Sequence, residues 1–109
     1  MSDPAAALAS KLSELWIVSR PVILERMAAL RATYASLSAN LVDAQARREG
    51  REVAHKLAGV LGTFGLPQGS IIASSIEGVL MAETPLTPAD VSALATRITE
   101  LDAVIASKE

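Results

Sequence analysis

Apolar residues recur at alternating steps of four and three along most of this chain. The clearest run links Ile23, Met27, Leu30, Tyr34, Leu37 and Leu41. This spacing places every member on one face of a helix, and that face must pack against other elements. No stretch of useful length alternates with the period of a strand. The pattern therefore predicts an all-α fold.

Caps and helix breakers divide the chain into five expected helices. Ser2 or Asp3 is a candidate N-cap before Pro4, and Ser19 with Pro21 is typical of a second helix start. The expected helices cover approximately residues 4–18, 19–44, 46–64, 67–82 and 87–105. They predict an up-down four-helix bundle with an additional N-terminal helix, formed as a single domain over residues 1–109.

Composition excludes several classes of function. The chain has no cysteine, one histidine, three aromatic residues and a net charge of −2. We therefore expect no thiolate chemistry and no nucleic-acid binding, because a basic surplus is missing. No apolar run approaches the ~20 residues that span a bilayer, and no basic region precedes an apolar stretch at the N-terminus. We expect a cytoplasmic protein with no membrane partner.

The one histidine, His55, lies in the third expected helix. On a helical wheel, one buried stripe gathers Val53, Leu57, Val60, Leu61 and Phe64. His55 lies nearly opposite the centre of this stripe. The residues that share its side are Arg48, Arg51, Glu52, Gly59 and Gly62. The period therefore predicts an exposed imidazole.

Two glycines beside an exposed histidine need an explanation, because glycine inside a helix costs about 1 kcal/mol relative to alanine. Close packing of another helix does not account for glycines that face away from the core. Gly59 and Gly62 instead indicate an open platform on which a second macromolecule approaches the ring. The flanking arginines suit an incoming anion, above all a phosphoryl group.

An imidazole that is not protonated is a nucleophile and can carry a phosphoryl group on nitrogen. The sequence lacks the residues that other kinds of chemistry would need. No second histidine or cysteine is present to build a hydrolase triad, and "GVLGTFG" lacks the lysine of a phosphate-binding loop. Glu52 is the nearest carboxylate, too little for a metal site. We expect Glu52 to be a surface acid or a hydrogen-bond partner that orients the ring.

The segment "AHKLAGVLGTFGLP", with the later "SIE", resembles the histidine-containing phosphotransfer domain of two-component phosphorelays. Ala54, His55, Leu57 and Gly59 match the pattern of that family. The resemblance is tightest over residues 51–67. It implies that His55 accepts a phosphoryl group on Nε2 from a receiver-domain aspartate and returns it to another receiver.

The resemblance also implies the partners. These are response-regulator receiver domains and hybrid histidine kinases, with Mg²⁺ held by the receiver and no cofactor or ATP site here, so the chain is a carrier rather than an enzyme. Many family members have lysine where this chain has Ala58, and Lys56 offers a charge from a different angle. The expected docking residues are Arg48, Arg51, Glu52, Lys56, Ala58, Gly59 and Gly62.

Two other readings stay open. The same platform would also serve a non-catalytic module that binds receivers or kinases without transfer. The chain would alternatively be the dimerisation and phosphoacceptor region of a histidine kinase. We rank that reading third, because the sequence offers no ATP-binding domain and no obvious exposed apolar seam, and we expect a monomer.

Overall fold

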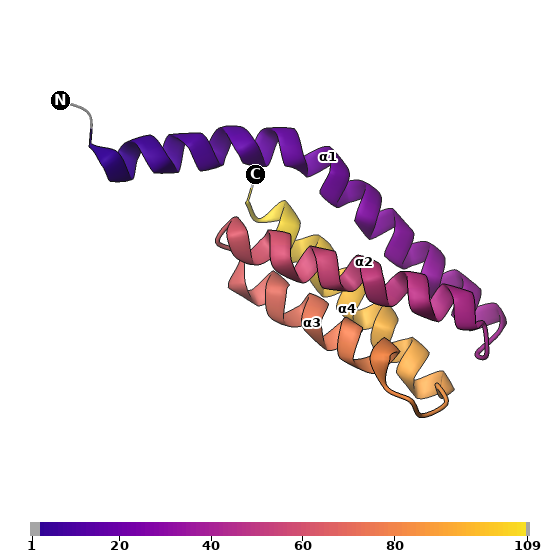
Figure 1. The fold of residues 1–109 in the computed structure, drawn as a ribbon. Helices are drawn as coiled ribbons and strands as arrows, with labels where there is room; N and C mark the ends of the chain where they lie inside the picture. The colour runs from indigo at the N-terminus through magenta and orange to yellow at the C-terminus, as the bar shows by residue number, and fades with distance from the viewer. Residues whose placement is uncertain (1–2, 109) are drawn as a thin grey trace.

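The computed structural model describes residues 3–108, which form four α-helices: α1 (Pro4–Ala39), α2 (Ala44–Thr63), α3 (Pro67–Met81) and α4 (Pro88–Ala106). Each helix packs on the next one along the chain, and α4 packs back on α1 (Figure 1). Among the described residues, the backbones of the diagonal pairs α1–α3 and α2–α4 do not approach each other closely. This is the predicted all-α, up-down bundle.

The predicted break at Ser19 and Pro21 is wrong. α1 runs on through Pro21, so the additional N-terminal helix is the first part of α1 rather than a separate element. A proline inside a helix removes one hydrogen bond and bends the axis, and Figure 1 shows α1 bending between its two halves. Helix persists there because Trp16 and Ile23, on either side of the bend, are both buried.

The remaining helix ends follow the chemistry of their caps. Asp3 caps α1 by accepting from the Ala5 N–H, whereas Ser2 lies outside the described residues. α2 ends where Gly65 adopts a positive φ of 72°, a conformation that suits glycine. Thr87 and Asp90 form the predicted capping box at the start of α4. The second helix boundary was placed too late, since α1 ends at Ala39 and α2 already begins at Ala44.

The core runs between the four helices and is mainly aliphatic. Trp16 closes one end of it against Phe64, with the ring centroids 5.3 Å apart in an edge-to-face arrangement. On α2, Leu57 and Leu61 are fully buried and Phe64 nearly so, while Val53 and Val60 are half-buried at the margin. The predicted buried stripe of α2 is therefore confirmed, and it fixes which side of this helix faces solvent.

Candidate functional site

His55 lies in the middle of α2 with its side chain 75% exposed. Its neighbour Ala54 and the next-but-one residue Leu57 are fully buried, so the packing of α2 holds the imidazole outward. The ring Nδ1 lies 2.9 Å from Oε2 of Glu77, on α3. A carboxylate only accepts hydrogen bonds, so this bond requires the proton to be on Nδ1. Nε2 then carries the free lone pair of the neutral ring, and none of the residues 3–108 hydrogen-bonds to it.

Glu77 meets His55 because two other contacts fix how α3 lies along α2. Near the start of α3, the Ser70 hydroxyl donates to the Ala58 carbonyl of α2 at 2.7 Å. At the other end of α3 and just beyond it, Arg47 of α2 donates to the carbonyls of Leu80, Ala82 and Thr84. The second contact also satisfies carbonyl groups that the end of a helix leaves without a partner. The histidine pair lies between these two anchors, so its geometry depends on both.

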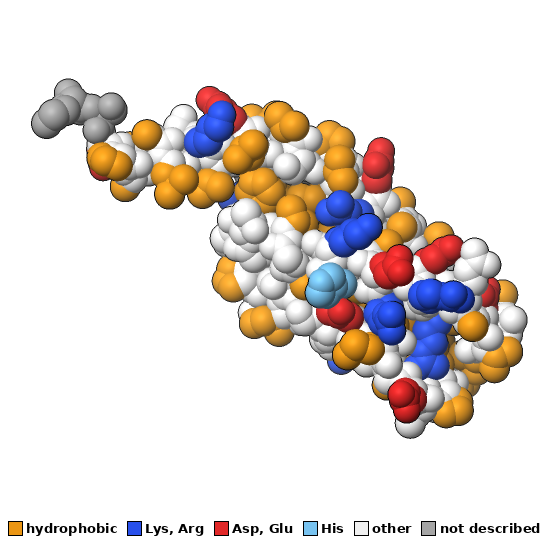
Figure 2. Space-filling model, in the orientation of Figure 1, with side chains coloured by type: hydrophobic (Ala, Val, Ile, Leu, Met, Phe, Trp, Pro, Cys, Tyr) orange, Lys and Arg blue, Asp and Glu red, His pale blue; other side chains and the backbone are white. Residues whose placement is uncertain are grey.

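His55 and Glu77 line a shallow hollow of about 390 Å³ between α2 and α3. Its other lining residues are Arg51, Glu52, Lys56 and Met81. In Figure 2 the histidine lies on an open part of the surface, with basic and acidic side chains next to it. The hollow thus presents one ring nitrogen, two cations, the carboxylates of Glu52 and Glu77 and a thioether to an approaching molecule. A phosphoryl group entering it would meet hydrogen-bond donors of positive charge.

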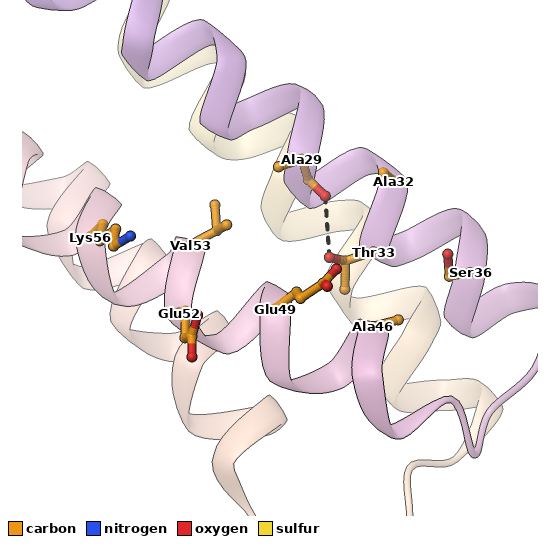
Figure 3. Close-up of a pocket in the computed structure, with 9 residues that line it drawn as sticks. All are labelled: Ala29, Ala32, Thr33, Ser36, Ala46, Glu49, Glu52, Val53 and Lys56. Carbon is orange, nitrogen blue, oxygen red and sulfur yellow. Dashed lines mark hydrogen bonds between the residues drawn. The ribbon is translucent and has the colours of Figure 1, made fainter.

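A second hollow, of about 340 Å³, lies between α1 and α2 (Figure 3). Its α1 wall is made of small residues, Ala29, Ala32, Thr33 and Ser36, and its α2 wall includes Glu49 and Val53. Glu52 and Lys56 line both hollows. These two side chains therefore stand between the hollow beside His55 and the hollow beside α1.

The glycines of α2 have different roles. A Cβ placed on Gly59 would meet nothing within 4 Å, and one on Gly62 would make only an ordinary contact with Ser70. A Cβ on Gly50 would lie 2.5 Å from the Thr33 side chain, so this glycine permits the close approach of α1 and α2. Gly59 has no such packing reason within the bundle. Its open surroundings agree with the expectation that it leaves room beside the histidine.

Only some of the predicted site residues lie beside His55 in the structure. The hollow brings Arg51, Glu52, His55 and Lys56 together. Arg48, Gly59 and Gly62 are exposed elsewhere on α2, and Ala58 is half-buried against the core.

The sequence interpretation missed three residues that build this site. Glu77 is the hydrogen-bond partner of His55, so of the two roles expected for Glu52 the structure shows the exposed surface acid. The "SIE" segment already contained this glutamate, but its place opposite the histidine depends on the packing of α3. Met81 and Arg47 gave no separate signal in the sequence.

The described residues contain no cluster of acidic or histidine side chains fit for a metal ion.

The comparisons with known proteins place the chain in a family. The family model of the Hpt domain matches residues 11–105. The chain belongs to the Hpt family. Its members are the phosphotransfer modules of phosphorelays, so this Hpt domain is such a module.

Among residues 3–108, no helix is long and apolar enough to cross a membrane.

Protein RcaC of Microchaete diplosiphon is 33% identical to this Hpt domain over 100 residues. The match covers 92% of the present chain and 15% of that relative, so the chain spans less than a sixth of the relative's length. No solved structure matches the domain significantly.

Proposed function

We propose that His55 is the phosphoryl acceptor and donor of this Hpt domain and that receiver domains are its partners. The observation that carries the proposal is the bond from Nδ1 to Glu77 on an exposed ring. This bond leaves the Nε2 lone pair as the nucleophile. The role of the histidine in the family supports the same assignment.

The transfer step balances without a further reactant. The Nε2 lone pair attacks the phosphorus of an aspartyl phosphate, and the bond from phosphorus to the aspartate oxygen breaks. The aspartate leaves as a carboxylate, and the proton on Nδ1 stays beside Glu77, which stabilises the positive charge that develops on the ring. The reverse step returns the phosphoryl group to a second receiver. The chain thus acts as a carrier, and the receiver supplies the Mg²⁺ and the remaining chemistry.

Arg51 and Lys56 suit the incoming phosphoryl group. Arg51 lies one helical turn before His55, and both cations line the same hollow as the ring. Many family members have lysine at the position of Ala58, which is uncharged. Arg51 and Lys56 then supply the positive charge for the phosphoryl group. Arg48, Gly59 and Gly62 extend the docking surface along α2.

The test incubates the domain with a receiver that carries radioactive phosphate on its aspartate. We expect a label that is stable in base and labile in acid, and His55→Gln should abolish it while the helical circular dichroism stays unchanged. Label that persists on the His55→Gln protein would overturn the assignment. A wild-type domain that binds the phosphorylated receiver and gains no label would show a non-catalytic binding module.

Glu77→Gln tests the orienting bond. The amide can accept or donate, so the preference for a proton on Nδ1 should weaken and transfer should slow without being abolished. Nitrogen chemical shifts of the imidazole report the tautomer directly. Unchanged shifts and an unchanged rate would show that Glu77 does not position the ring. Glu52→Gln, in the same hollow but without the bond, is the matched control and should keep the tautomer.

A further inference from the structure

The N-terminal part of α1 extends beyond the other three helices (Figure 1). From Pro4 to Leu15 its residues are exposed, except for the half-buried Leu12, and the first buried residue is Trp16. An isolated helix of about 12–15 residues is only marginally stable in water. This arm therefore gains little from the bundle and would gain from a helix packed alongside it.

An exposed apolar seam with coiled-coil spacing begins on the arm and continues along α1 past Trp16. We call the α1 seam the set Leu8, Lys11, Leu15, Val18 and Val22, in steps of three, four, three and four. Its four aliphatic members are 61%, 43%, 73% and 44% exposed in chain order. Steps of this kind place side chains on one face of a helix, which is what a second helix packs against. The dimeric kinase region ranks third partly for want of an obvious exposed apolar seam in the sequence, and the exposed residues of α1 provide one.

We propose that the α1 seam pairs two copies of this chain in an antiparallel dimer. The first four seam positions are symmetric about Ser13: Leu8 and Val18 lie five residues from it on opposite sides, and Lys11 and Leu15 lie two residues from it. A two-fold axis at this level places Leu8 of one copy against Val18 of the other, and Lys11 against Leu15. An interface between identical copies requires this self-complementarity.

The charges of the arm favour the same arrangement. Lys11 and Glu14 form an exposed pair within one chain, 4.0 Å apart. In the antiparallel dimer, the stem of Lys11 covers Leu15 of the second copy, and its ammonium group comes beside Glu14 of that copy. A parallel pair would instead bring the two Lys11 side chains against each other. The arm carries one lysine and one glutamate between residues 4 and 19, so it lacks the basic excess that suits an anionic membrane.

The proposed interface leaves the phosphotransfer site free. Trp16, which packs into the bundle against Phe64, faces a different side of α1 from the exposed seam. His55 lies on α2, and no residue of the α1 seam lines either hollow beside it. The dimer thus presents two separate histidines, and its test does not depend on their chemistry.

The first experiment measures the mass of the full chain by sedimentation equilibrium over a range of concentrations. We expect a reversible rise from the monomer to the dimer mass. Val18→Glu should weaken the association at least tenfold with the helical signal retained, because Val18 is 73% exposed and would face the apolar Leu8 of the second copy. Ile17→Glu is the matched control, because Ile17 is 71% exposed on the same arm but lies off the seam. A wild-type protein that stays monomeric at millimolar concentration would overturn the proposal, as would equal effects of the two variants.

A second experiment tests the antiparallel register. The chain has no cysteine, so Lys11→Cys and Leu15→Cys proteins each carry one thiol. After mixing and oxidation we expect a disulfide between the two variants, because residue 11 of one copy faces residue 15 of the other. Either variant on its own should form few disulfide-linked dimers. Efficient cross-linking of each variant with itself would show a parallel pair and overturn this register. A seam that binds phosphatidylglycerol vesicles or a receiver domain, with no self-association, would overturn the dimer.

Discussion

Gly50 and Gly59 are nine residues apart on α2, yet the two glycines answer to different constraints. At Gly50 a methyl group would lie 2.5 Å from Thr33, so Gly50→Ala must push α1 and α2 apart and should cost about 1–3 kcal/mol. At Gly59 a methyl group meets open space, so Gly59→Ala should raise the free energy of unfolding by up to about 1 kcal/mol. Urea denaturation of the two variants measures the contrast directly.

The bulkier Gly59→Leu separates stability from access at the same position. The variant should fold, because nothing within 4 Å opposes the added side chain. Transfer from a phosphorylated receiver should nevertheless slow sharply, since the leucine would stand beside the imidazole one turn away. If Gly59→Leu folds and transfers at the wild-type rate, Gly59 has no part in admitting the partner.

At the scale of the helix, α4 has an acid-sensitive start. The Thr87 backbone N–H and its hydroxyl both donate to Asp90, and these bonds hold the pKa of Asp90 below its ordinary value of 3.8. Because the pKa is lowered by folding, the ionised carboxylate stabilises the native state above the ordinary pKa. This contribution is lost as the pH falls through the lowered value.

Thermal melts of the wild type and Asp90→Asn across this acid range test the capping box. Asparagine keeps an acceptor but not the charge. The wild type should therefore have the higher Tm above pH 3.8, and the difference should shrink as the pH falls below it. A difference in Tm that is the same at every pH would show that the charge of Asp90 contributes nothing to the helix start.

The helices also show what the sequence could and could not predict. The apolar spacing predicted α2, α3 and α4 closely, because each of these helices has one buried stripe and a start marked by a capping side chain or, in α3, by Pro67. It failed at Pro21, because burial on both sides of the bend offsets the cost of a proline inside a helix. That burial is a tertiary effect, and the residues around Pro21 do not reveal it in the sequence. It identified His55 but not its partner Glu77, because that pairing depends on the register between two helices.

At the scale of the whole molecule, charge governs the encounter with a partner. The chain has a net charge of −2, but Arg48, Arg51 and Lys56 gather on the exposed side of α2. These cations should attract an acidic face of a receiver, so the transfer rate should fall as salt screens them. Stopped-flow transfer at rising NaCl concentration gives the slope, and reversal of all three charges should flatten it. If this triple variant keeps both the rate and its salt dependence, the cluster is only a solvated face.

The short connection between α2 and α3 has a consequence for how the molecule assembles. Residues 64–66 join the two helices, and the bond between His55 and Glu77 spans only 22 residues. Contacts this local close small loops, and the entropy lost in closing them is correspondingly modest. The bond between His55 and Glu77 can therefore form early in folding, when α2 and α3 pair as a helical hairpin. The contact between Trp16 and Phe64 forms only after α1 docks.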